Sequence, residues 1–189
     1  MFVRLALCGA LAVAFAAQVH AQPVPEGYLC CNLRTDGSWI SDINYAEAGK
    51  SMIAVGTPVK TTGYGRYRVY IELDGKRQAI GNDYSRDLNM DAFAQRYIVA
   101  TDPKAKIASY PEKVREAIKT ARLRPGMTRE QVIMSVGYPI SSENPNLDAK
   151  VWRFWLSSFS EFQVIFDDGG RVKEISTFDP HTRSVVVME

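Results

Sequence analysis

The sequence predicts an α+β protein in two parts, and three observations carry this prediction. Residues 22–102 contain short alternating segments separated by glycine turns, which favours a strand-rich small barrel or meander followed by a helix. Residues 103–189 begin with helical periodicity. Three alternating segments rich in apolar residues then follow, so helices are expected to precede strands in this second part.

Residues 1–21 have the features of a secretory signal peptide. Arg4 precedes an uncharged apolar run of thirteen residues, Leu5 to Ala17, and small residues precede the expected cleavage site after Ala21. The run is shorter than the ~20 apolar residues that a membrane-spanning helix needs. We therefore expect a periplasmic protein whose mature chain starts at Gln22 and holds no transmembrane helix. An uncleaved anchor and a lipid-modified cysteine are the alternatives.

The firmest element of the N-terminal part is a β-hairpin. Apolar and polar residues alternate along Arg66–Leu73, Asp74-Gly75 is a typical two-residue turn, and Lys76–Ile80 forms the returning strand. Gly56-Thr57-Pro58 separates two further short strands. A first strand is expected over Tyr28–Leu33.

One helix is expected at the end of the N-terminal part. Asn89 is a plausible N-cap, and Phe93 and Tyr97 fall on one apolar face of the segment that follows. Pro103 ends this periodicity. Residues 104–108 have the composition of a linker.

Two capping-box pairs place the helices of the C-terminal part. Ser109 with Glu112 and Thr128 with Gln131 each have the spacing in which the two side chains bond each other's backbone amides. Gly137 and the nearby proline stop the second of these helices.

Strands are expected at Val151–Leu156, Phe162–Phe166 and Val172–Thr177. Asp167-Asp168-Gly169-Gly170 joins the last two as a hairpin turn. The apolar tail Ser184–Met188 is expected to add an edge strand.

Four motifs of the C-terminal part occur in a fixed order. They are Leu123 to Val132 (LRPGMTREQV), Gly137-Tyr138-Pro139, Trp152-Arg153-Phe154 and Phe166 to Val172 (FDDGGRV). Together they resemble the SmpA/OmlA family, which includes BamE of the outer-membrane β-barrel assembly machine. The resemblance covers about residues 109–178. It implies an α-α-β-β-β fold and a binding role at the cell envelope, with envelope proteins or anionic phospholipid as partners.

The resemblance also implies a partner- and lipid-binding surface around Tyr138, Ile140 and Arg153. Tyr138 stands between a helix-stopping glycine and a proline, where the chain turns at the surface, and nothing local obliges Ile140 to be buried. Arg153 alternates with Trp152 and Phe154 along the strand, so it points away from the face that those two residues share with the core. An exposed cluster of these three residues has the composition of a binding hot spot. In the alternative, Tyr138 and Ile140 cap the core and Arg153 is merely solvated.

The segment from Lys104 to Arg129 concentrates positive charge. It holds eight basic and two acidic residues, a local charge of +6. Near anionic headgroups each well-placed cation gains roughly 1 kcal/mol. A solvated helix face is the alternative.

Cys30 and Cys31 are a candidate redox site in an oxidising compartment. Neighbouring Cα atoms lie ~3.8 Å apart, which is shorter than the ~4.4 Å lower limit of ordinary disulfides. Side chains of neighbouring strand residues also point to opposite faces. We therefore expect one buried thiol and one that is partly exposed, with a disulfide between the two neighbours as the alternative.

Composition argues against several classes of function. The chain of 189 residues has a formal charge of +2, which gives no strong attraction to nucleic acid. His181 is the one histidine after the signal peptide, so a metal site of histidines and cysteines is not expected. The sequence has neither a G-x-S-x-G elbow nor a Walker loop. Paired carboxylates for glycoside hydrolysis stay open, because their pairing is spatial.

These observations lead to one functional expectation. The protein is expected to be a non-catalytic, BamE-like binding protein without cofactor, on the periplasmic side of the outer membrane, where it supports membrane assembly or integrity. The alternative is a secreted or periplasmic inhibitor or ligand-binding protein on the same fold.

Overall fold

The computed structural model describes residues 26–189, so the expected signal peptide at 1–21 lies outside the described residues. The fold is α+β. A strand-rich sheet that curls into a half-barrel comes first, helices follow, and a three-stranded antiparallel sheet with a short C-terminal helix completes the chain.

The N-terminal half contains eight short strands and one helix within the described residues. These are β1 (Glu26–Leu29), β2 (Leu33–Thr35), β3 (Trp39–Ser41), β4 (Ser51–Ile53), β5 (Pro58–Gly65), β6 (Arg68–Leu73), β7 (Lys76–Gly81), α1 (Met90–Tyr97) and β8 (Ile98–Val99). Six strands form one sheet in the order β3-β7-β6-β5-β1-β8, and β2 pairs with β4. The β3–β7 pair is parallel and the other pairs of the six-stranded sheet are antiparallel.

The expected hairpin is confirmed as β6 and β7. Asp74 and Gly75 have φ angles of 49° and 74°, the backbone of the turn that matches the twist of two paired strands. Val69, Ile71 and Leu73 are buried on the inner face of the sheet. They pack with Phe93, Ala94 and Tyr97 of α1, so helix and sheet share one apolar core.

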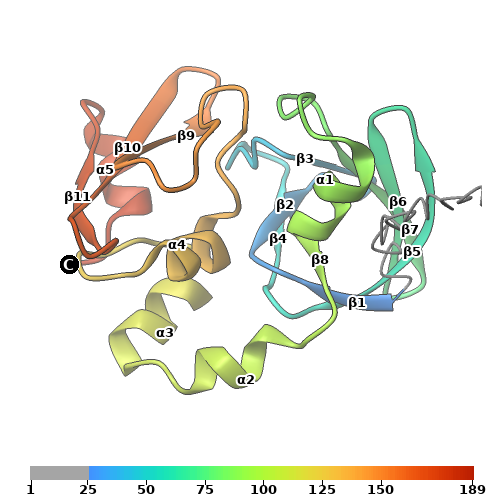
Figure 1. Cartoon of the computed structure of the whole chain (residues 1–189), viewed down its shortest axis with the longest axis horizontal. Coiled ribbons are helices and arrows are strands. Elements are labelled where there is room, and N and C mark those ends of the chain that lie inside the picture. Colours follow the sequence, from blue (N-terminus) through green and yellow to red (C-terminus); the bar gives the residue numbers. More distant parts are fainter. Residues whose placement is uncertain (1–25) are drawn as a thin grey trace, which may run out of the picture.

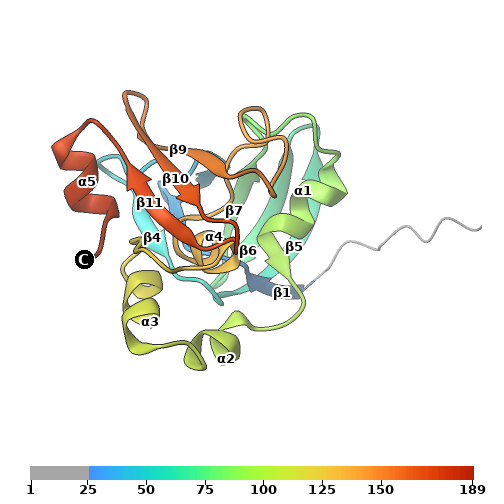
Figure 2. The same cartoon turned by 60° about the vertical axis from the view of Figure 1, so that its left-hand side comes forward.

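The C-terminal half contains four helices and three strands. These are α2 (Pro103–Ala108), α3 (Glu112–Lys119), α4 (Arg129–Val136), β9 (Val151–Ser157), β10 (Ser160–Phe166), β11 (Val172–Ser176) and α5 (Pro180–Val186). The sheet order is β11-β10-β9, and both pairings are antiparallel. Figures 1 and 2 show α2 and α3 at one end of the molecule, opposite the loops that join β9 to β10 and β11 to α5.

The alternation expected in the three C-terminal strands is confirmed. Trp152, Phe154 and Leu156 of β9 are buried, and so are Phe162, Val164 and Phe166 of β10. The side chains of α3, α4 and α5 that face them belong to the same core cluster. The helices therefore cover one face of the sheet, and the polar residues between the buried ones lie on the other face.

One capping box is confirmed and the other is wrong. Thr128 and Gln131 bond reciprocally at the start of α4, with N···O distances of 2.9 and 3.3 Å. Ser109 does not cap α3, which begins at Glu112 after Pro111. The Ser109 hydroxyl donates instead to the carbonyl of Lys106 and ends the preceding helix.

Two segments expected to be non-helical are helices. Residues 104–108, expected as a linker, belong to α2, and most of the expected edge strand 184–188 belongs to α5. Both helices start with an aspartate and a proline: Asp102 accepts from the Lys104 amide at 2.9 Å, and Asp179 caps α5 in the same way. Beyond α5, Val187 forms only an isolated parallel bridge with Leu123, which is not an edge strand.

Candidate functional site

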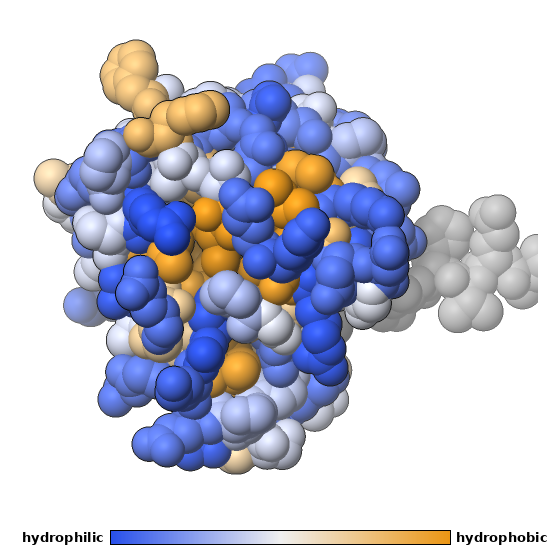
Figure 3. Space-filling model, turned by 90° about the vertical axis from the view of Figure 1, so that its left-hand side faces the viewer, coloured by the Kyte–Doolittle hydropathy of each residue, from blue (hydrophilic) through white to orange (hydrophobic). Residues whose placement is uncertain are grey.

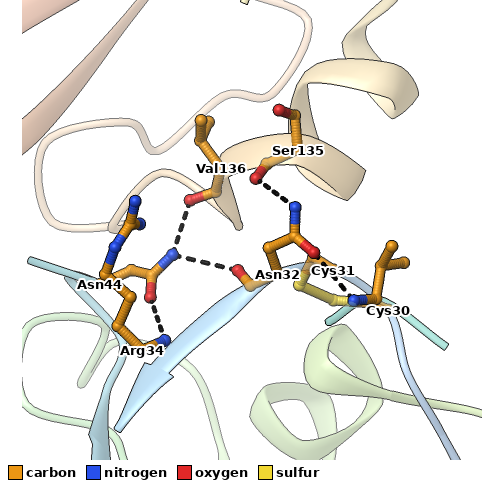
Figure 4. Close-up of a disulfide and its surroundings, with 8 residues drawn as sticks. Cys30, Cys31, Asn32, Arg34, Asn44, Ser135 and Val136 are labelled. Carbon is orange, nitrogen blue, oxygen red and sulfur yellow. Dashed lines mark hydrogen bonds between the residues drawn. A yellow bond between two sulfur atoms is a disulfide. The ribbon is translucent and has the colours of Figure 1, made fainter. Parts of the chain in front are cut away.

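Buried asparagines join the two halves, next to apolar contacts that also cross between them. Figure 4 shows Asn32, which follows the cysteine pair and points at the C-terminal end of α4. Its side-chain amide donates to the carbonyls of Ile118 and Ser135 at 2.5 and 3.0 Å. Its side-chain oxygen accepts from the Val55 amide at 2.9 Å, and its own backbone amide donates to Met134. All of its polar groups are therefore used.

Asn44 makes the second connection. Its amide donates to the carbonyl of Val136 at 2.9 Å, where α4 ends, and its side-chain oxygen accepts from the Arg34 amide at 2.8 Å. Gly137 faces this asparagine, and an added Cβ there would lie 3.1 Å from its Nδ2 atom. The glycine of the helix stop thus also lets the two halves approach closely.

The expected free thiols at Cys30 and Cys31 are wrong, because the two neighbours form a disulfide. Both residues are buried. The expected continuous strand 28–33 is also broken here. The Cys30 amide donates to Tyr97, whereas Asn32 turns to bond α4, so the chain leaves the six-stranded sheet between β1 and β2. Tertiary hydrogen bonds on both sides hold the cysteine pair at this bend.

A pocket of about 530 Å³ opens beside the disulfide, between the edge of the six-stranded sheet and the helices α2 and α4. Apolar groups dominate its lining. The lining residues are Cys30, Val99, Thr101, Asp102, Pro103, Lys106, Glu130, Ile133, Met134 and Tyr138. This size and character are those of small-molecule and side-chain binding pockets, which occur preferentially between domains. Two of the residues singled out from the sequence, Cys30 and Tyr138, therefore meet in one pocket.

An ion pair crosses the rim of the pocket. Lys106 Nζ of α2 lies 2.6 Å from Glu130 Oε1 of α4, and about half of each side chain is exposed. The hydrogen bond to Glu130 raises the pKa of Lys106, so the lysine stays charged at neutral pH. At this exposure the pair contributes little to stability, and it places one positive and one negative group at the rim.

Tyr138 forms one wall of the pocket as a neutral phenol. Burial raises the pKa of Tyr138, and the neighbouring Arg96 guanidinium, 5.3 Å from the ring centroid, opposes this shift only in part. The ring also meets Tyr97 edge-on, with centroids 6.0 Å apart. Cys30 is in a disulfide and Tyr138 is protonated, so neither of these two residues is an activated nucleophile.

Ile140 and Arg153 do not join Tyr138. Ile140 is 4% exposed, so the expectation that it lies at the surface is wrong. Its carbonyl accepts from Asn144, which also bonds the backbone of Arg153 and thereby covers the free edge of β9. The Arg153 side chain is exposed on the outer face of the sheet, as expected, where its Nε lies 3.1 Å from Glu161.

Two arginines of the basic segment Lys104–Arg129 bind backbone carbonyls and stabilise the fold. Arg122 donates to the carbonyls of Ser184 and Val185, which holds the chain end of α5. Arg129 donates to three consecutive carbonyls at residues 147–149 and lies over the ring of Phe166. The lysines of α2 and α3 remain exposed. The positive surface is therefore smaller than the charge count of the segment indicates.

Most of the pocket lining could not be recognised in the sequence. Lys106 was expected in a linker and Pro103 at the end of the preceding helix, although an aspartate followed by a proline is a recognised helix start. Nothing in the sequence marks Val99, Ile133 and Met134 as pocket residues, because an apolar residue gives the same sequence pattern whether it faces a core or a pocket.

No group of three or more histidine, cysteine, aspartate or glutamate side chains is arranged to hold a metal ion within residues 26–189. None of the helices in this range is long and apolar enough to cross a bilayer. Comparison with protein-family models, with curated proteins and with solved structures finds no match.

Proposed function

We propose that the protein is a non-catalytic binding protein of the cell envelope, similar in role to BamE, which supports outer-membrane assembly or integrity through contacts with envelope proteins or anionic phospholipid. The motif resemblance of residues 109–178 supports the envelope role. The pocket between the halves supports binding as the activity, and it is the observation that carries this proposal.

The chemistry of the pocket favours an apolar group carried by a charged partner. Val99, Ile133 and Met134 supply apolar contacts, and Tyr138 adds a ring with a hydroxyl group. The rim carries both signs of charge, at Lys106, Glu130 and Asp102, and suits charged groups of a partner next to the apolar group. Both an apolar side chain beside charged residues of a protein partner and the acyl chain of a phospholipid fit this lining.

The pocket also favours one specific alternative, a periplasmic protein that binds a small ligand. Its volume of about 530 Å³ is within the range of small-molecule sites, and it is walled by both halves of the molecule. Identifying the molecule that occupies the pocket separates the two functions.

The experiment is affinity capture from cross-linked cells with a variant that fills the pocket. Thr101 lines the pocket but is exposed, so Thr101→Trp narrows the pocket without disturbing the core. Thr62→Trp is the matched control, because Thr62 is an exposed threonine on β5 outside the pocket. Both variants are first checked by thermal unfolding.

The wild type and the Thr62 variant are expected to capture outer-membrane assembly subunits, and the Thr101 variant to lose that capture. A small molecule seen in the native mass spectrum of the wild type alone, without such partners, would establish the ligand-binding alternative. Equal capture by all three proteins would remove the pocket as the binding site.

A further inference from the structure

Two phenylalanine side chains stand almost entirely in solvent. Phe159, in the turn between β9 and β10, is 96% exposed, and Phe178, between β11 and α5, is 107% exposed. Neither belongs to a core cluster of the described chain. Single exposed apolar residues are ordinary on protein surfaces, but two fully exposed rings without any intramolecular contact point to an intermolecular one.

The two rings lie at the same end of the three-stranded sheet. Thr177 donates through its hydroxyl to the carbonyl of Glu161 at 2.9 Å, which ties the end of β11 to the start of β10. Phe178 directly follows Thr177 in the chain, and Phe159 lies two residues before Glu161. Figures 1 and 2 place both loops at the same end of the molecule, and Figure 3 shows apolar side chains standing clear of the hydrophilic surface there.

Tyrosines of the N-terminal half extend this aromatic end. Tyr45 lies close to Ser158, in the turn that carries Phe159, and close to Tyr84, which is 43% exposed. We call Phe159, Phe178, Tyr45 and Tyr84 the aromatic edge. It spans both halves of the protein and comes from four separate stretches of chain.

The charged side chains beside the aromatic edge are of both signs. Glu161 is paired with Arg153 at 3.1 Å, and Asp179 is occupied in capping α5. Lys50 lies over the Tyr45 ring, 5.7 Å from its centroid, and is itself paired with Glu47 at 3.7 Å. Asp179 stays ionised, because the hydrogen bonds from Thr182 lower its pKa. The charges beside the rings therefore give no net attraction to phosphate, and the apolar rings carry the contact.

We propose that the aromatic edge inserts into the interfacial region of a phospholipid bilayer. The rings protrude from separate loops, so a partner must enclose each ring from all sides, which a deformable lipid interface does without a preformed pocket. Phenylalanine flanked by tyrosine suits this boundary, because the phenyl rings enter the acyl region and the hydroxyl groups stay at headgroup level. The outer-membrane role proposed above is not required, since insertion depends on apolar contact and not on a particular lipid charge.

The test is flotation of the full protein with extruded vesicles of phosphatidylcholine and, separately, of phosphatidylethanolamine with phosphatidylglycerol, at about 0.15 M salt. Phe159→Ser and Phe178→Ser are each expected to lower the partition coefficient about tenfold or more, and the double variant about a hundredfold or more. Val151→Ser is the matched control, because Val151 is 45% exposed at the opposite end of β9. It should bind as the wild type does.

Two further variants serve as controls for the flotation test. Phe159→Trp keeps a large ring and is expected to retain binding, with fluorescence that shifts to shorter wavelength on vesicles. The pocket variant Thr101→Trp should float normally, so failure of the pocket proposal is distinguishable from failure of this one. Absence of wild-type binding to both vesicle types, or equal binding by the double serine variant, would overturn the proposal. Wild-type dimerisation that the serine variants abolish, without vesicle binding, would assign the edge to a second copy instead.

Discussion

The side-chain amide of Asn44 donates to the backbone carbonyl of Asn32 at 3.1 Å, and each of these asparagines also bonds a carbonyl at the end of α4. The two halves are thus held by a small buried polar network at the centre of the molecule. Such a network fixes one relative placement of the halves, because a shift of either one leaves several buried groups without partners.

Asn32→Ala is expected to lower the free energy of unfolding by about 2–3 kcal/mol, because three buried backbone groups each lose a hydrogen bond worth about 1 kcal/mol. Urea unfolding followed by tryptophan fluorescence measures this. Gln95→Ala, an exposed amide on α1, is the control and should change stability by less than about 0.5 kcal/mol. A loss at Asn32 as small as the control's would mean that the network does not hold the halves together.

The free energy of unfolding is expected to fall as the pH rises from about 4 to about 6, because Asp42 ionises over this range. Burial raises the pKa of Asp42 to about 6, and hydrogen bonds from the backbone amides of Tyr84 and Asp83 offset this only in part. Between its unfolded and folded pKa values the native state binds more protons, so unfolding becomes easier as pH rises. The ionised carboxylate then costs about 3 kcal/mol at pH 7.

Asp42→Asn keeps an oxygen that accepts from the same amides but does not ionise. Its unfolding free energy should therefore lack this decline, and the difference between the two pH profiles isolates Asp42. Urea titrations at half-unit steps from pH 4 to pH 8 provide the profiles. Parallel profiles for wild type and variant would show that Asp42 titrates normally.

Alkylation of the denatured protein without reduction is expected to leave Cys30 and Cys31 unlabelled, since they form a disulfide with each other. After reduction both should be labelled, and intact mass spectrometry of a chain spanning 22–189 counts the labels. Cys31→Ser serves as the control, because it leaves one free thiol that reacts without reduction. Two labels on the unreduced wild type would exclude the disulfide.

Gly81→Ala is expected to destabilise the protein by about 1–3 kcal/mol through overpacking. A Cβ at Gly81 would lie 2.0 Å from Cζ2 of Trp39, whose ring rests on this part of β7. Gly65→Ala is the matched control in the same sheet, where the nearest atom is the hydroxyl of Tyr70 at 3.1 Å, the free end of an exposed side chain.

The double variant Trp39→Ala with Gly81→Ala tests the cause. It should cost no more than Trp39→Ala alone, because the clash disappears with the indole ring. Additive losses in this thermal-unfolding comparison would assign the cost to the strand backbone instead.

Most of the α+β architecture was predictable from the sequence because its signals are local. Asp74-Gly75 forms its turn by its own backbone preference, and Thr128 with Gln131 satisfies amides within one helical turn. The period-two alternation of β9 and β10 needs only one buried face. These features depend on neighbours in the sequence, so the sequence by itself determined them.

The elements that only the tertiary structure decided are those whose local preference is weak or misleading. Helices α2 and α5 have six and seven residues, too few to be stable alone, and packing against the rest of the protein supports them. The valines of α5 prefer strands, yet Val186 is buried in the C-terminal core and overrides that preference.

The candidate site divides in the same way. The sequence by itself determined that Tyr138 stands at a helix stop and that Arg153 faces outward. The tertiary structure decided that Ile140 is buried, that the cysteines are paired, and that Tyr138 meets Cys30 across the junction of two halves. A pocket of this kind arises from residues more than a hundred positions apart, so its walls depend on long-range packing that no local pattern encodes.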